Sequence, residues 1–259
     1  MYQTLEYSAA GGVGVLRLAR PERLNAINLT LAAELEALCR VLRDERALRV
    51  LVIHGTGRAF CAGADIANMD GLDGADDHYR FLEALQNALN AVEALPVPTI
   101  AAVHGIAFGG GCELALACDF RLCEPDARFG VPEIKLGLVP GAGGTQRLAR
   151  MLPVAIAKQM IYFGEPLDAP SALQHGLVNA LSAPGGVLDL AHDWATHLAG
   201  LAPLALRSAK LLVHGAALGG LANGIEAERQ AVSYLFQTRD AKEGMQAFLA
   251  RRNANFEGK

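Results

Sequence analysis

Short apolar runs and longer helical repeats alternate along the first two thirds of the chain. Residues 29–45 and 78–94 place apolar side chains three and four positions apart, which predicts helices that bury one face. Strands that alternate with helices are usually parallel and joined by helical crossovers, so the pattern predicts an α/β fold. The apolar runs that predict strands are residues 2–8, 12–19, 49–54, 99–103 and 120–123, of which the first two form a hairpin turned at residues 10–12.

Residues 69–77 interrupt this alternation. They are rich in glycine and aspartate and carry no helical or strand period, so they are expected to form a mobile loop.

After about residue 145 the pattern becomes almost entirely helical, with a single strand predicted at residues 177–181. We therefore expect an α/β core over residues 1–190 and a helical C-terminal region over residues 191–259. The last helices have apolar faces that are too large for a small appendage to bury by itself. We therefore expect these faces to pack on a second subunit, with packing within the same subunit as the alternative. The predicted helices are residues 144–151, 154–163, 187–200, 203–214, 223–236 and 239–252.

Composition and charge exclude several classes of protein. Hydrophobic residues make up 52% of the 259 residues and charged residues 19%, which excludes a disordered chain. The net charge of −4 comes without a basic block, so neither nucleic acid nor a membrane surface is an expected partner. With no export signal and no apolar run of about 18 residues, we expect a cytoplasmic protein without a membrane-spanning helix.

The cysteines and histidines do not form a predicted site. The five cysteines are odd in number and include no CxxC pair, which favours reduced thiols. Cys112 has apolar neighbours and no histidine to activate it, so it is expected to fill space in the core. The seven histidines show no metal-ligand spacing, so no metal is expected.

A glycine-rich junction in the middle of the chain is the first candidate for chemistry. Gly109, Gly110 and Gly111 connect the strand predicted at residues 99–103 to an apolar helix start. The first N–H groups of a helix have no intrahelical partner, and glycine lets a ligand approach them closely. Gly110 is therefore a suitable place for a developing oxyanion, with Glu113 one turn into the same helix. Taken alone, these residues would equally suit a tight turn followed by a solvated glutamate.

Three further stretches surround this junction in the sequence. Residues 59–66 follow the strand predicted at residues 49–54, and residues 128–137 contain a second carboxylate, Glu133. Residues 140–148 then add a glycine-rich turn. In this order and spacing, the four stretches resemble the enoyl-CoA hydratase branch of the crotonase superfamily. The C-terminal residues 243–256 resemble that family's ending, so the resemblance covers essentially the whole chain.

The resemblance implies a fold and an assembly. The fold would be crotonase-like, a spiral of ββα units followed by a helical C-terminal region that mediates trimerisation. Family members assemble as trimers or dimers of trimers through this region, so a homotrimer or homohexamer is expected.

The resemblance also implies an activity, that of a lyase acting on acyl-CoA thioesters. Such an enzyme adds water across the 2,3 double bond of a 2-enoyl-CoA to give a 3-hydroxyacyl-CoA, as in fatty-acid β-oxidation or related acyl-CoA catabolism. Coenzyme A is then part of the substrate, and no separate cofactor is expected.

By the same resemblance, the backbone N–H groups of Ala64 and Gly110 would form the oxyanion hole. Glu113 would orient and activate the water, and Glu133 would deliver a proton to carbon 2. Two nearby carboxylates repel each other when both are ionised, which helps to keep one of them protonated.

The expected contacts to the substrate and its CoA portion are mostly backbone contacts from one loop. Many relatives have lysine where this chain has Ala67, and that departure removes one possible phosphate contact. Gly141 belongs to a turn that could position water through its backbone groups. The residues expected to bind substrate or CoA are Ala62, Ala64, Asp65, Ile66, Ala67, Gly110 and Gly141.

Three other functions compete with hydration. Another crotonase-type reaction, such as double-bond isomerisation or hydration of branched or aromatic enoyl-CoA esters, would use the same oxyanion hole. A nucleotide-dependent oxidoreductase is disfavoured because no complete GxGxxG follows a strand and no GxxxxGK[ST] occurs. A non-catalytic, RNA-associating family member is disfavoured by the intact pair of glutamates and by the mixed charges of the first helix.

Overall fold

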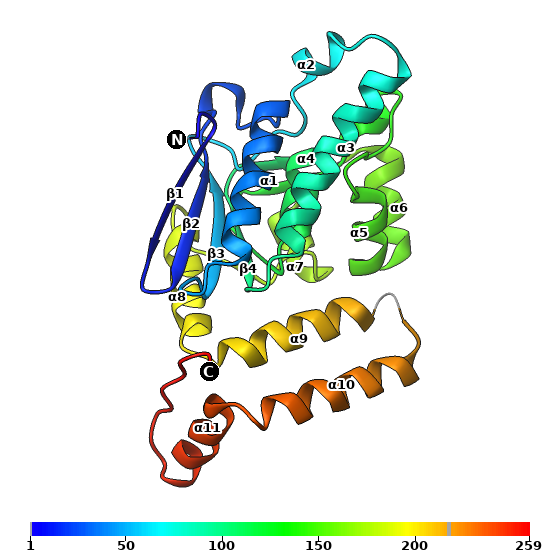
Figure 1. Ribbon diagram of the computed structural model, residues 1–259. Coiled ribbons are helices and arrows are strands. Elements are labelled where there is room, and N and C mark those ends of the chain that lie inside the picture. Colours follow the sequence, from blue (N-terminus) through cyan, green and yellow to red (C-terminus); the bar gives the residue numbers. More distant parts are fainter. Residues whose placement is uncertain (1, 217–218) are drawn as a thin grey trace.

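A six-stranded sheet lies at the centre of the computed structural model, which describes residues 2–216 and 219–259 (Figure 1). Its strand order is β1-β2-β3-β4-β6-β9, and every neighbouring pair is parallel except the β1–β2 hairpin. The predicted α/β class and the N-terminal hairpin are therefore confirmed. The strands are β1 (Leu5–Ala10), β2 (Val13–Leu18), β3 (Val50–Gly55), β4 (Thr99–Val103), β6 (Phe120–Cys123) and β9 (Ala180–Leu181).

The central sheet is covered by helices on both faces, which explains why its strands are apolar throughout. Along β3, Leu51 and Ile53 join the larger core with α1 (Leu29–Arg43) and α3 (Gly74–Glu93). The alternate residues of β3, Val50 and Val52, face α8 (Val187–Ala199) on the other side. Because successive strand residues point to opposite faces, one short strand serves both cores.

A second, three-stranded sheet supports the glycine junction. It consists of β5 (Ile106–Phe108), β7 (Arg128–Gly130) and β8 (Leu167–Asp168), in that order. Strands of two or three residues carry no measurable period, so the sequence pattern did not predict them. β5 leads directly through Gly109 into α4 (Gly110–Ala117).

Several predicted boundaries differ from the structure. Residues 69–77 are not a continuous loop, because α2 (Ile66–Asp70) occupies the first part and α3 begins at Gly74. The strand expected at residues 177–181 is confined to β9. The short helix α7 (Ala169–Gln174) was not predicted, although the Asp168 side chain caps it by accepting a hydrogen bond from the Ser171 N–H at 2.9 Å. Helices α5 (Gly144–Met151) and α6 (Val154–Phe163) match their predicted ranges.

The last three helices extend away from the sheet, below it in Figure 1. They are α9 (Pro203–Ala216), α10 (Leu221–Leu235) and α11 (Arg239–Leu249), and α9 and α10 lie side by side. A buried ion pair attaches α9 to the core, with Lys210 Nζ 2.7 Å from Asp119 Oδ2. The boundary expected at residue 190 falls inside α8, which packs on the sheet, so the helices that leave the sheet begin with α9.

Within the described ranges, no helix combines the length and the apolar character needed to cross a membrane.

Candidate active site

The N-terminus of α4 lies against a loop that comes from a distant part of the sequence. The Cys61 N–H donates to the Ile106 carbonyl at 3.1 Å, and the Phe108 N–H donates to the Cys61 carbonyl at 3.0 Å. On the other side of this loop, the Ile27 N–H donates to the Gly63 carbonyl at 2.7 Å. The segment of residues 61–66 is therefore held between β5 and residue 27 by backbone hydrogen bonds.

This packing brings the two predicted oxyanion donors together. A Cβ built on Gly110 would lie 3.4 Å from the Ala64 backbone nitrogen. Gly110 is the first residue of α4, so its N–H has no intrahelical acceptor. Neither the Ala64 nor the Gly110 N–H donates to an acceptor among residues 2–216 and 219–259. Two adjacent free backbone donors are the arrangement that an oxyanion hole requires.

Glu113 projects from the first turn of α4 into the core and is only 2% exposed. Its Oε1 accepts two backbone hydrogen bonds, from the Ala142 N–H at 2.8 Å and from the Gly144 N–H at 2.7 Å. Burial raises the pKa of Glu113 to about 7, and the two N–H donors act in the opposite direction. The nearby Glu133 carboxylate adds to the increase in this pKa.

Glu133 reaches the same place from the 3-10 helix η2 (Pro132–Leu136). A Cβ on Gly109 would lie 3.0 Å from Glu133 Oε1, so the glycine at the start of α4 makes room for this carboxylate. Gly109 also has a φ of +49°, a conformation that a side chain would disfavour. Burial raises the pKa of Glu133, and its Oε2 is buried without a hydrogen-bond partner among the described residues. The structure thus brings together both predicted glutamates and both predicted donors.

The other predicted binding residues lie on the loop that leads into α2. Some of them are exposed, whereas the side chain of Asp65 forms an ion pair within the chain. Ile66 and Ala67 are exposed at the start of α2, where a large ligand can reach them. The Asp65 carboxylate is instead occupied within the chain, because Arg20 Nη2 donates to its Oδ2 at 2.9 Å. This ion pair ties the loop to Arg20, and the expected contact of Asp65 with the CoA portion stays a prediction. The contacts of Ala62, Ala64, Ile66 and Ala67 with CoA stay predictions.

Gly141 lies next to the hydrogen bonds that hold Glu113. Its carbonyl accepts a hydrogen bond from Gln86 Nε2 at 2.7 Å, while the following N–H, that of Ala142, donates to Glu113. The predicted site includes this turn, but it does not include the donors Ala142 and Gly144 or the α3 side chains that support the turn. No local sequence pattern predicts these contacts, because the residues that form each hydrogen bond are far apart in the sequence.

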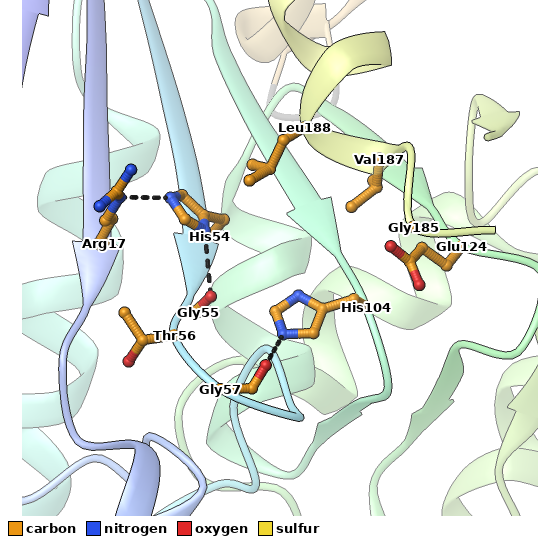
Figure 2. A pocket seen from close by; sticks show the side chains of 10 residues that line it. All are labelled: Arg17, His54, Gly55, Thr56, Gly57, His104, Glu124, Gly185, Val187 and Leu188. Carbon is orange, nitrogen blue, oxygen red and sulfur yellow. Dashed lines mark hydrogen bonds between the residues drawn. The ribbon is translucent and has the colours of Figure 1, made fainter. Parts of the chain in front are cut away.

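A separate hollow of about 330 Å³ lies elsewhere, between β3 and the start of α8 (Figure 2). His54 there donates through Nδ1 to the Gly55 carbonyl at 3.0 Å and accepts at Nε2 from Arg17 Nε at 3.2 Å. The Gly55 carbonyl can only accept, so Nδ1 carries a proton, and the Arg17 N–H can only donate, so Nε2 carries none; the ring is therefore neutral in this arrangement. Burial, which lowers the pKa of His54, acts in the same direction. None of the predicted site residues lines this hollow. The candidate active site is therefore the surface around the N-terminus of α4.

Comparisons with known proteins agree with the geometry. The family model for enoyl-CoA hydratase/isomerase matches residues 8–259. A protein of Rhizobium meliloti (strain 1021) named "Probable enoyl-CoA hydratase" is 43% identical over 256 residues, which cover 98% of each chain. The crotonyl-CoA hydratase of Syntrophomonas wolfei is 38% identical, again over 98% of each chain.

Solved structures support the same assignment. A crystal structure of an enoyl-CoA hydratase from Bacillus anthracis superposes with a TM-score of 0.96 at 35% identity, covering 99% of this chain and all of the other. The crotonase-like fold expected from the sequence is therefore confirmed. With a family model that spans nearly the whole chain and close relatives of equal length, this protein belongs to the enoyl-CoA hydratase/isomerase family.

Proposed function

We propose that this protein hydrates 2-enoyl-CoA thioesters to 3-hydroxyacyl-CoA. The observation that supports this most directly is that two carboxylates of raised pKa, the buried Glu113 and the half-buried Glu133, meet beside two backbone N–H groups that have no acceptor among the described residues. Addition of water to a conjugated thioester needs a base, an acid and a site for negative charge on the thioester oxygen. The chain offers one group for each of these needs.

In this proposal Glu113 is the base. The Ala142 and Gly144 N–H groups both donate to its Oε1, which favours the carboxylate form. Oε2 is then left to accept a proton from water. As the water oxygen bonds to carbon 3, its proton passes to Glu113, and the electrons of the double bond move onto the thioester oxygen.

Glu133 completes the reaction as the acid. Burial raises the pKa of Glu133, which favours the protonated carboxyl, and its buried Oε2 has no competing partner within the described ranges. The proton moves from Glu133 to carbon 2 while the thioester carbonyl forms again. Solvent then returns a proton to Glu133 and removes one from Glu113.

Ala64 and Gly110 would stabilise the developing charge on the thioester oxygen. Backbone donors are fixed before the reaction, so they do not have to reorganise as the charge moves. Loss of one such donor costs about 3–4 kcal/mol of transition-state stabilisation in comparable sites. The backbone of Ala62, Ala64 and Ile66 would hold the CoA portion nearby.

Isomerisation of enoyl-CoA is the second candidate, since the matching family model covers both reactions. An isomerase moves one proton between carbons and needs only one acid–base carboxylate. Here two carboxylates lie close enough for the charge of one to raise the pKa of the other. That pairing favours hydration, because adding water requires both a base and an acid.

The test is turnover of crotonyl-CoA, followed as loss of the conjugated enoyl-thioester absorbance. The wild type is expected to turn over, and Glu133→Gln is expected to be slower by at least about a hundredfold, because it cannot supply the proton. A 3-enoyl-CoA provides the comparison, since an isomerase would instead create conjugated absorbance. A folded wild type that isomerises the 3-enoyl ester but leaves crotonyl-CoA unchanged would contradict the proposal.

A further inference from the structure

Helix α3 presents a polar stripe to the turn that holds Glu113. Gln86, Asn90 and Glu93 are four and three residues apart, so they lie on one side of the helix. The Gln86 amide donates to the Gly141 carbonyl at 2.7 Å. Asn90 and Glu93 act on the same turn through a third side chain, that of Arg147.

Arg147 is a largely buried arginine in the first turns of α5, with its side chain 10% exposed. Its Nη2 lies 2.6 Å from Glu93 Oε2 and donates to Asn90 Oδ1 at 2.8 Å. Its Nη1 donates to the Ala142 carbonyl at 3.0 Å. One planar guanidinium therefore joins α3 to the turn through two separate nitrogens, Nη2 and Nη1, a fixed spacing that the compact ammonium of a lysine does not reproduce.

The turn is shaped around this guanidinium. Gly143 has a φ of +108°, and a Cβ at that position would lie 2.2 Å from Arg147 Nη1. The arginine thus occupies the space beside the peptide that connects the two donors to Glu113.

From these contacts we propose that Arg147 is a positioning residue, which, together with Glu93 and Asn90, orients the Ala142 and Gly144 N–H groups toward Glu113. The inference rests on the proposed role of Glu113 as the base. In this arrangement α3, α4 and α5 meet at one carboxylate. A small rotation of the turn would remove both hydrogen bonds from Glu113 Oε1. It would thereby change the protonation of Glu113 and the orientation of its carboxylate toward the attacking water.

The electrostatic effect has the same direction as the geometric one. Burial raises the pKa of Glu113, whereas the positive charge of Arg147 and the two N–H donors favour its carboxylate form. Without Arg147, Glu113 would be held less firmly and would also be harder to ionise.

Three variants separate positioning from general structure. Arg147→Gln removes the charge and the fork, while Arg147→Lys keeps the charge but replaces the two separated nitrogens of the fork with one compact ammonium. Arg150→Gln is the matched control, because Arg150 lies on the same helix and, among the described residues, its side chain donates hydrogen bonds only to Gln146. Melting temperature and circular dichroism establish that each variant is folded.

The kinetic readout is kcat and KM for crotonyl-CoA as a function of pH. We expect Arg147→Gln to lower kcat at least about tenfold with little change in KM, and to move the acidic limb of the profile to higher pH. Arg147→Lys should lie between this variant and the wild type, and Arg150→Gln should match the wild type. If Arg147→Gln does not fold, Arg147→Lys decides: wild-type kcat and an unmoved acidic limb in that variant would overturn the proposal.

A second readout does not depend on turnover. The carboxyl signal of Glu113 can be titrated by carbon NMR in the free protein and assigned by its absence in Glu113→Gln. It should titrate at higher pH in Arg147→Gln, or in Arg147→Lys by a smaller amount, and be unchanged in Arg150→Gln. A wild type inactive on crotonyl-CoA that still shows this shift would refute the proposed function alone. An active wild type whose Glu113 titration is unmoved in both Arg147 variants would refute the positioning role alone.

Discussion

Glu113 combines two opposing influences within a few ångströms. The core around it disfavours a charge, and two backbone N–H groups at 2.7 and 2.8 Å favour one. The result is a carboxyl group with a pKa of about 7, near the value at which a general base works best at neutral pH. Two measurable consequences follow, one for activity and one for stability.

The activity should depend on the ionisation of Glu113. Since the base must be a carboxylate, kcat/KM for crotonyl-CoA is expected to fall below about pH 7, by about tenfold for each further pH unit. The control is stability to at least pH 5, measured by circular dichroism over the same range. A rate that stayed constant down to about pH 5 would show that the essential carboxyl titrates as an ordinary exposed glutamate does.

The stability should change with pH in the opposite direction. The pKa of Glu113 is about 7 in the folded protein, above its ordinary value of 4.5, so between these two pH values the folded state binds more protons than the unfolded chain does. Glu113 therefore lowers the free energy of unfolding as pH rises from about 4.5 to 7, by up to about 3 kcal/mol in total.

Glu113→Gln tests that sign, because its amide oxygen can still accept both N–H donors while the titration is removed. Denaturant unfolding of both proteins at pH 5 and pH 8 gives the difference in free energy of unfolding. The free energy of unfolding of the variant, minus that of the wild type, is expected to be larger at pH 8 than at pH 5. A difference that is the same at both would contradict the raised pKa.

At the scale of residues, sequence patterns identified the carboxyl groups proposed to react, but not the side chains that fix their position and affect their pKa. Glu113 and Glu133 stand within glycine-rich stretches that carry a family resemblance, so they could be found. Arg147 and Gln86 act across elements through single hydrogen bonds, and no spacing in the chain connects them. The ion pair between Arg20 and Asp65 joins residues 45 positions apart, so no local pattern shows it, and the expected contact of Asp65 with CoA stays a prediction.

At the scale of elements, the site depends on how closely α4 packs against the segment before Ala64. All eight residues of α4 are buried, and a Cβ on Gly111 would lie only 2.2 Å from the Cys61 carbonyl oxygen. The oxyanion hole thus exists only if the helix and the segment of residues 61–66 stay at this separation.

Gly111→Ala should force α4 and the segment of residues 61–66 apart. We expect it to lower the free energy of unfolding by about 1–3 kcal/mol and to reduce kcat, because the clash is with backbone rather than a flexible side chain. Gly224→Ala is the matched helical control, since a Cβ there meets nothing within 4 Å in the described chain. It should be neutral or stabilising by up to about 1 kcal/mol. Equal unfolding free energies for the two variants would contradict the close packing of α4.

The elements that sequence patterns predicted well are those with a strong period or clear ends. α1 was predicted from the helical spacing of its apolar residues, and it begins where Asn28 accepts a hydrogen bond from the Leu31 N–H at 2.9 Å. β5, β7 and β8 were missed because pairing with distant segments, rather than local preference, makes them strands. The start of α3 at Gly74 was missed because glycine and aspartate near a helix start resemble a loop.

At the scale of the whole molecule, the helices α9–α11 leave the core with apolar side chains in solvent. Leu221 is 80% exposed on α10 and Phe248 is 84% exposed on α11. A single domain rarely exposes so many large apolar groups in one region. The assembly expected from the family resemblance, a homotrimer or a dimer of trimers, would cover them.

Light scattering coupled to gel filtration can test this assembly. The wild type is expected at three or six times the chain mass of 27.3 kDa, and Leu221→Asp or Phe248→Asp should shift it toward smaller species. Val41→Asp is the control, since Val41 is comparably exposed on α1 in a different part of the molecule. A wild type that runs as a monomer at all concentrations would contradict the expected assembly.

The most direct test of the central claim is to follow the oxygen atom that the reaction adds. Crotonyl-CoA is incubated with the wild type in water carrying a heavy oxygen isotope, and the product is analysed by mass spectrometry, with Glu113→Gln in parallel. The wild type is expected to form 3-hydroxybutyryl-CoA carrying one heavy oxygen at carbon 3, and the folded variant is expected to form almost none. Equal incorporation by the variant, or a wild-type product of unchanged elemental composition, would contradict hydration by Glu113.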